Sequence, residues 1–222
     1  MPSITAKQVG KRKEKNKPAF VPKEIQKEAQ ADVATFGKQL SSWSVGFIDI
    51  ETTGLAADFG FILGACIKPS GSKKILEFRI DSYPDYKKDL CDDHRLVMDI
   101  KEAMSQFDVL IHFNGNDFDM PFIDTRLAIW GEKRSPLVHD IDLLPIVRKK
   151  LRLHSRRLDA VATALQVKHE KTKLDPMVWQ RASHGSTKDL DYIMEHCRMD
   201  VVVLEEVFVK LKGFVDAIFR RR

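Results

Sequence analysis

Three short apolar runs follow one another closely in the first half of the chain, and their order restricts the folds open to it. Val45–Ile50 and Phe59–Ile67 are largely apolar, and Ile75–Ile80 alternates between apolar and polar positions. These lengths and patterns are typical of β-strands, and the turn sequence KPSGSKK joins the last two. Short connections between successive strands predict an antiparallel meander.

The second half of the chain alternates helical and extended patterns. Apolar residues recur at helical spacing over Asp93–Phe107, and the apolar run Val109–Phe113 has the length of a strand. Pro121 falls in the first turn of a helix predicted at Asp119–Ile129, where proline is tolerated. Further helices are predicted at 143–151, 157–165 and 188–214, with a brief strand at 138–141. This order predicts an α/β fold.

Length and composition indicate a globular protein without a membrane span. The chain has 222 residues, 43% of them hydrophobic, which is enough to bury a core without support from disulfides or structural metal ions. Cys66, Cys91 and Cys197 form no CxxC pair, so they indicate neither a disulfide framework nor a zinc ribbon. No run reaches 18 apolar residues, and we see no secretory signal. We expect a cytoplasmic location and no membrane partner.

The net charge of +5 lies entirely in the first 38 residues. Residues 1–38 hold nine basic and four acidic side chains, whereas the charges of residues 39–222 balance. We therefore predict a basic, flexible leader at 1–38 and a main domain at 39–222. The leader is either a solvated tail or a tether that adds salt-sensitive affinity for nucleic acid phosphates. A short helix within 24–40 is compatible with the sequence.

Two carboxylates end the first apolar run. Asp49 and Glu51 are two positions apart, so in a strand both side chains project from the same face. Unpaired carboxylates placed in this way repel each other and lose hydration. Arginine or lysine partners, or solvent, would offset this cost. A divalent metal ion held by hard oxygen ligands, Mg²⁺ or Mn²⁺, would offset it too.

Two further segments carry acids where α/β folds build sites. Asp119 falls at a strand-to-helix junction, where it is either a helix N-cap or part of a site, and Asp117 is a rival acid. His196 and Asp200 are four residues apart on the predicted terminal helix and therefore share one face. They form either a pair that stabilises the helix or part of a catalytic site.

Together these segments resemble the motifs of the DEDD 3′–5′ exonuclease superfamily. DIETTGL (49–55) is similar to its first motif, and HCRMD (196–200) falls where the third belongs. NGNDFD (114–119) is similar to the second motif of family-B DNA polymerase proofreading domains, and the chain looks closest to their stand-alone relatives. The resemblance covers residues 44–212. It implies an RNase H-like fold, in which a mixed central sheet, an antiparallel meander followed by parallel strands, is flanked by helices.

The resemblance also implies an activity. It predicts an exonuclease that hydrolyses DNA phosphodiester bonds in the 3′–5′ direction and releases mononucleotides. Two Mg²⁺ or Mn²⁺ ions are expected, one to activate water and one to stabilise the leaving oxygen. The metal ligands implied are Asp49, Glu51, Asp119 and Asp200, with Asp49 bridging the two ions. The substrate contacts implied are Thr52, Leu55, Asn114 and Phe118.

One departure from the family concerns His196. The tyrosine branch of this superfamily places a tyrosine four residues before the last aspartate, and the histidine branch places a histidine five residues before it. His196 precedes Asp200 by four, and Tyr192 precedes it by eight, about 12 Å along a helix. Tyr192 is therefore too distant, and we expect His196 to be catalytic, by orienting or deprotonating the attacking water.

Basic and aromatic residues each have two interpretations. Val147–Arg157 is either a solvated helix end or the wall of a nucleic acid groove. Its candidate substrate contacts are Arg148, Lys149, Arg156 and Arg157. Phe61, Phe113 and Trp179 are either core residues or platforms for stacked bases.

Two classes of function are open at this point. The first is an exonuclease whose partner is nucleic acid, with DNA favoured over RNA and a replication or repair protein as a further possible partner. The second is a non-hydrolytic nucleic-acid-binding protein on an exonuclease scaffold. The presence of all four acids favours the enzyme.

Overall fold

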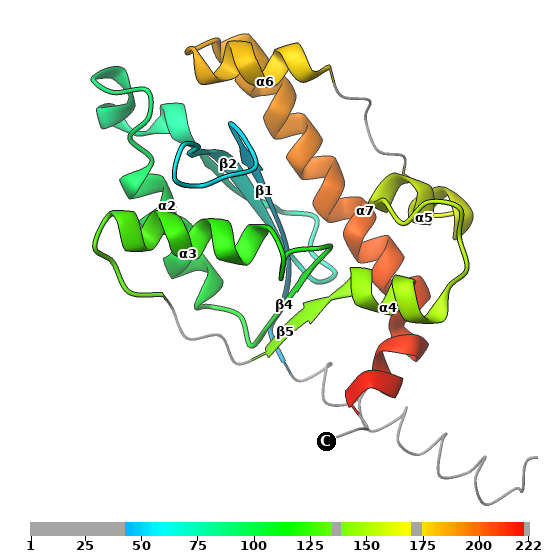
Figure 1. Cartoon of the computed structure of the whole chain (residues 1–222). Coiled ribbons are helices and arrows are strands. Elements are labelled where there is room, and N and C mark those ends of the chain that lie inside the picture. Colours follow the sequence, from blue (N-terminus) through cyan, green and yellow to red (C-terminus); the bar gives the residue numbers. More distant parts are fainter. Residues whose placement is uncertain (1–42, 135–138, 170–174, 220–222) are drawn as a thin grey trace, which may run out of the picture.

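The computed structural model describes residues 43–134, 139–169 and 175–219 (Figure 1). The predicted leader and the helix predicted within 24–40 lie outside these residues. The elements are β1 (Val45–Thr52), β2 (Ile62–Pro69), β3 (Leu76–Arg79), η1 (Ile80–Ser82), η2 (Pro84–Lys87), α2 (His94–Met104), β4 (Val109–His112), α3 (Asp119–Ile129), β5 (His139–Asp142), α4 (Leu143–Lys150), α5 (Leu158–Ala164), α6 (Pro176–Ser183) and α7 (Thr187–Phe219). Within these ranges, no helix has both the length and the apolar character needed to cross a bilayer.

The five strands form one mixed sheet in the order β3-β2-β1-β4-β5. β1 pairs antiparallel with β2, and β2 pairs antiparallel with β3. β4 then pairs parallel with β1, and β5 pairs parallel with β4. The predicted α/β fold, with a meander followed by parallel strands, is confirmed.

Most element boundaries lie within a few residues of the predicted ones. β1 runs to Thr52, so both Asp49 and Glu51 lie inside the strand. α3 spans the predicted Asp119–Ile129. α6 was not predicted, although Asp175 caps it by accepting a hydrogen bond from the Met177 amide and a proline opens it. A helix of eight residues is too short to give a clear apolar period.

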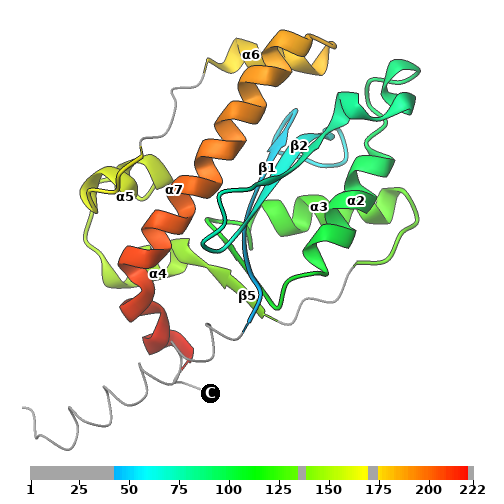
Figure 2. The ribbon, with the colours of Figure 1, turned by 180° about the vertical axis from the view of Figure 1, so that it is seen from behind.

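Helices cover both faces of the sheet (Figures 1 and 2). Ile48 and Ile50 of β1 face the core that the residues of α2 and α3 share, whereas Phe47 faces the core formed with α4, α5 and α7. Because side chains alternate along a strand, Asp49 and Glu51 project on the same face as Phe47. Both carboxylates therefore face α7.

The long helix α7 approaches the sheet closely beside these acids. Gly64 of β2 pairs with Glu51 in register. A Cβ atom at Gly64 would lie 2.3 Å from Met194 Sδ of α7 and 2.9 Å from the backbone oxygen of Phe78, so a larger residue would force these neighbours to move. The glycine therefore brings α7 close to β2.

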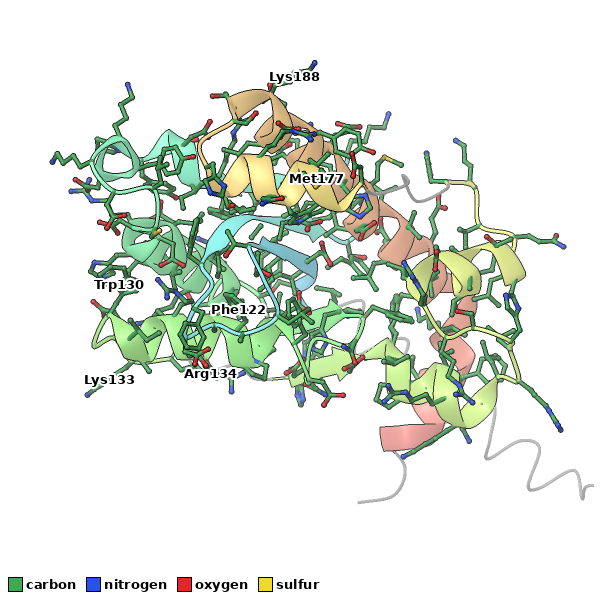
Figure 3. All side chains as sticks on the ribbon, turned by 45° about the horizontal axis from the view of Figure 1, so that its top comes forward. Phe122, Trp130, Lys133, Arg134, Met177 and Lys188 are labelled. Carbon is green, nitrogen blue, oxygen red and sulfur yellow. The ribbon has the colours of Figure 1, made fainter. Side chains whose placement is uncertain are left out.

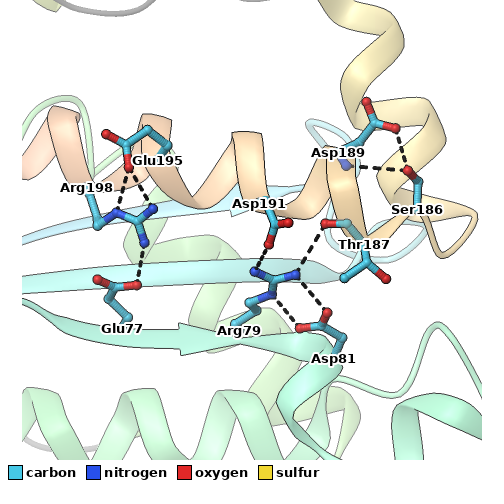
Figure 4. Close-up of polar contacts among 9 residues, drawn as sticks. All are labelled: Glu77, Arg79, Asp81, Ser186, Thr187, Asp189, Asp191, Glu195 and Arg198. Atoms are coloured by element: carbon cyan, nitrogen blue, oxygen red, sulfur yellow. Dashed lines mark hydrogen bonds and ion pairs between the residues drawn. The ribbon is translucent and has the colours of Figure 1, made fainter.

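Ion pairs fasten α7 to the edge strand β3 (Figure 4). Arg198 of α7 donates hydrogen bonds of 2.7 Å to Glu77 of β3 and to Glu195 one turn earlier. Arg79 of β3 bonds to Asp191 of α7. These pairs bracket the helical segment that carries His196, so they limit how that segment can rotate.

Candidate metal and nucleic acid site

One acid of β1 meets a histidine and an acid of α7. Ligand atoms of Glu51, His196 and Asp200 all lie within 4.8 Å of one another. His196 Nε2 is 3.6 Å from Asp200 Oδ2. The exposed fractions of the three residues are 9%, 1% and 3%, so the cluster is almost fully buried. The structure thus brings together residues about 145 positions apart in the chain.

Trp179 of α6 supports this cluster. Its Nε1–H donates a hydrogen bond of 3.2 Å to Glu51 Oε2. Its ring also meets the His196 ring edge-on, with the centroids 6.1 Å apart. Trp179 therefore orients one member of the cluster and packs against another, a role that the sequence did not predict. The contact joins two helices to the end of β1, and no local pattern signals it.

Asp119 contacts the same strand from the start of α3. It is the first residue of α3 rather than the N-cap, which is Phe118. β4 pairs with β1 over Val45–Phe47, and further along β1 the Ile50 amide donates a 3.2 Å hydrogen bond to Asp119 Oδ1. Asp119 thus lies beside the backbone that joins Asp49 and Glu51, outside the cluster with His196. Asp117, the rival acid, is exposed.

Burial perturbs the acidity of Asp119. Removal from water raises the pKa of its carboxyl, and the nearby His112 and the Ile50 amide oppose that rise in part. The net pKa is about 6. Ionisation of this carboxyl is therefore costly in the folded protein.

A carboxylate at the end of β5 shapes the turn that carries Asn114. Asp142 accepts hydrogen bonds from the amides of Asn114, Asn116 and Leu144, at 2.8, 3.2 and 2.9 Å. It therefore caps α4 and holds the β4–α3 turn at the same time. Asn114 adopts a φ of 71°, a left-handed conformation that asparagine tolerates better than most residues. This role of Asp142 was not predicted, although an aspartate before an apolar run is a recognisable N-cap signal.

A groove of about 470 Å³ is lined both by acids and by residues of the basic segment. The acids are Asp49 and Asp200. The arginines that line it are Arg148, Arg156 and Arg157. Asn114, Phe113, Leu144 and Leu158 complete its walls, and we call it the arginine groove. Lys149 is exposed on α4 and is not one of the residues that line this groove.

A second cavity of about 380 Å³ is lined by Glu51, another of the acids. Glu51, Thr52, Leu55, Phe118 and Trp179 line it together with Ile50, Thr53 and Gly54, and we call it the apolar pocket. The Leu55 side chain is 90% exposed and forms part of its rim. Three of the four substrate contacts that the family resemblance implies, Thr52, Leu55 and Phe118, therefore line this pocket. Asn114, the fourth, lines the arginine groove. Phe61 instead belongs to the core.

Cys197 lies behind the acids and has a structural role. It is fully buried, and its Sγ donates a 3.4 Å hydrogen bond to the backbone oxygen of Asp49. Burial raises the pKa of the Cys197 thiol, so the thiol stays protonated and is a poor nucleophile. Its contact with β1 instead fixes the distance between α7 and the strand.

The donor set suits a hard divalent cation. Asp49 and Glu51 come from β1, Asp119 from the start of α3, and Asp200 from α7. All offer carboxylate oxygens, the ligands that Mg²⁺ and Mn²⁺ accept. His196 adds one nitrogen. Of these acids, Glu51 and Asp200 lie with His196 in the one group of described residues whose ligand atoms are close enough together to hold an ion.

Comparisons with known proteins agree with this architecture. A family model described as the RNase_H superfamily matches residues 46–212. No curated protein matches the chain. Among solved structures, the family B DNA polymerase from the hyperthermophilic archaeon Pyrobaculum calidifontis matches with a TM-score of 0.63 and 17% identity. The match covers 76% of this chain but 24% of the polymerase, so it supports the fold alone. The chain belongs to the RNase H superfamily, and its sheet with flanking helices is RNase H-like.

Proposed function

We propose that the protein is a metal-dependent 3′–5′ exonuclease that hydrolyses DNA phosphodiester bonds and releases mononucleotides. One observation carries the proposal. Glu51, which lines the apolar pocket, and Asp200, which lines the arginine groove, have carboxylate oxygens within 4.8 Å of each other. We call this meeting point the junction and expect a phosphodiester to bind there, with a nucleotide on each side. The direction of degradation rests on the likeness of the three motifs to DEDD exonucleases.

The two cavities offer different chemistry to the two sides of the substrate. In the arginine groove, Arg148, Arg156 and Arg157 present guanidinium groups that bind phosphates. In the apolar pocket, Leu55 and Phe118 present the surface that a nucleobase needs for stacking. We therefore place the terminal nucleotide in the apolar pocket and the rest of the strand along the arginine groove.

The carboxylates carry the reaction in this proposal. Asp49, Glu51 and Asp200 lie nearest the junction, and Asp119 supports the strand from the other side. Bound divalent cations supply the Lewis acidity that phosphodiester hydrolysis needs. The protein residues hold the acids at fixed positions: Trp179 orients Glu51, and the Ile50 amide orients Asp119.

A single assay tests reaction and substrate together. The purified protein is incubated with 5′-labelled single-stranded DNA, duplex DNA or RNA in Mn²⁺, Mg²⁺ or EDTA. The proposal predicts a ladder of shortened DNA that requires a divalent metal ion and disappears in EDTA. A ladder on RNA alone would show an exoribonuclease, and binding without any ladder would show a nucleic-acid-binding protein. Either result would contradict the proposal.

A further inference from the structure

We propose that His196 is a metal ligand, and that its nitrogen makes this site bind Mn²⁺ more tightly than Mg²⁺. The inference rests on the proposed function, since it assigns a ligand within the same metal site. It replaces the expectation from sequence that His196 orients or deprotonates the attacking water.

The positions of the donor atoms favour a ligand. His196 Nε2 lies 3.6 Å from Asp200 Oδ2, and a Glu51 oxygen lies within 4.8 Å of both residues' ligand atoms. With metal bonds of about 2.0–2.2 Å, neighbouring ligand atoms around one ion are roughly 3–4 Å apart. The separation between the imidazole and the carboxylate already falls in this range. A small movement of Glu51 would complete a nitrogen and two oxygens around one ion.

The surroundings of the His196 ring disfavour the alternative of a general base. A general base must reach the water it deprotonates within hydrogen-bond distance. The described residues that line the arginine groove and the apolar pocket do not include His196. The residue is 1% exposed, with Trp179 against its ring and Asp200 facing its Nε2. The ring is therefore buried among these neighbours and lines neither cavity.

The neighbouring Trp179 strengthens the case. Groups that hydrogen-bond to metal ligands fix the direction in which those ligands point. Trp179 Nε1–H occupies one oxygen of Glu51, Oε2, at 3.2 Å. The same indole packs edge-on against His196. One tryptophan therefore holds two of the three donors in position from outside the cluster.

A nitrogen donor has a consequence for the choice of metal. Imidazole is a common ligand of transition metal ions, whereas Mg²⁺ prefers carboxylate, carbonyl and water oxygens. A site made of carboxylates alone would bind Mg²⁺ and Mn²⁺ with similar affinity. A site that includes His196 gains affinity for Mn²⁺ that it does not gain for Mg²⁺.

Pulsed electron paramagnetic resonance of the full-length protein loaded with Mn²⁺ tests the inference directly, without nucleic acid or turnover. A directly bound imidazole nitrogen couples to the Mn²⁺ electron spin. We expect this coupling in the wild-type protein. Mn²⁺ that binds without nitrogen coupling would overturn the inference and leave the proposed exonuclease intact. Failure to bind any divalent ion would contradict both, so the two failures are distinguishable.

Matched variants provide a second test of the inference. In His196→Phe, which keeps an aromatic ring beside Trp179, the nitrogen coupling should disappear and Mn²⁺ affinity should fall at least about tenfold. Calorimetry should show a change in Mg²⁺ affinity of less than about twofold. His184→Gln, at an exposed histidine that follows α6, should match the wild type. His196→Gln replaces the phenylalanine variant if that one does not fold. Equal losses for both metals, or no loss, would overturn the inference.

Discussion

At the scale of single residues, the burial of the Asp119 carboxylate destabilises the folded protein at neutral pH. Its carboxyl has a pKa of about 6, chiefly because burial disfavours the charged form, and this lies above the ordinary value of 3.8. Between these two values the unfolded chain has lost its proton while the folded chain retains it. Raising the pH from 4 to 6 therefore lowers the free energy of unfolding, and at pH 7 the full cost is present. A bound cation would offset that cost.

Replacing this carboxylate should stabilise the metal-free protein. In Asp119→Asn the amide oxygen can still accept from the Ile50 amide, but no buried charge remains. We expect the free energy of unfolding in EDTA at pH 7 to rise by on the order of 1–3 kcal/mol, while nuclease activity falls. Urea unfolding at pH 4 and pH 7 measures the effect, which should nearly vanish at pH 4. Asp117→Asn, at an exposed position, is the control. A destabilised Asp119→Asn at pH 7 would refute this account.

At the scale of elements, one buried ion pair holds several segments together. Asp93 precedes α2 and is fully buried; it accepts hydrogen bonds from Arg126 of α3 and from the Ile62 amide of β2. Trp130, labelled at the end of α3 in Figure 3, donates a further bond of 2.8 Å to it. Arg126 also donates to the backbone oxygen of Ala57. The pair therefore anchors the β1–β2 loop that forms the rim of the apolar pocket.

Breaking this pair should be costly. Arg126→Ala leaves the Asp93 carboxylate buried without its cation, so we expect a loss of about 3–5 kcal/mol in the free energy of unfolding. The comparison is Arg95→Ala, which removes a largely exposed partner of Asp85 and should cost less than about 1 kcal/mol. Urea denaturation of both variants provides the measurement. Similar losses in the free energy of unfolding of the two variants would show that the buried network stabilises the protein no more than the exposed pair does.

The elements also show what the sequence could and could not predict. β1 and α3 were predictable because an apolar run, two acids and a proline in a first turn are local signals. The positions of Asp49 and Glu51 on one face followed from strand geometry alone. The contact of Trp179 with Glu51 was not predictable, because it depends on how α6 packs against the end of β1. Local patterns carry no information about such long-range packing.

At the scale of the whole molecule, charge is concentrated where the substrate would lie. The charges of residues 39–222 balance overall, yet three arginines line the same groove as Asp49 and Asp200. In the proposed function, the arginines bind the phosphate backbone and the acids hold the metal ions at the scissile bond. We therefore expect affinity and catalysis to depend on different residues.

Neutralising the groove should change the salt dependence of DNA binding. For a single strand, each lost phosphate contact reduces the slope of log K against log salt by about 0.7. We expect Arg156→Gln combined with Arg157→Gln to lower the slope by about 1–2. Arg148→Gln should have a larger effect than Lys149→Gln, because Arg148 lines the groove and its neighbour does not. Fluorescence anisotropy over a salt series checks this order. Equal effects for the two neighbours would argue against the groove.

The most direct test of the account compares wild-type protein with Asp200→Asn in Mn²⁺. Nucleotide release from 5′-labelled single-stranded DNA is measured at equal enzyme concentration, with Asp117→Asn as the exposed control. The account predicts that Asp200→Asn loses at least about a hundredfold in rate, because a carboxylate ligand of the metal site is gone. Asp117→Asn should retain the wild-type rate. Unchanged release by purified, folded Asp200→Asn would contradict the assignment of the catalytic site.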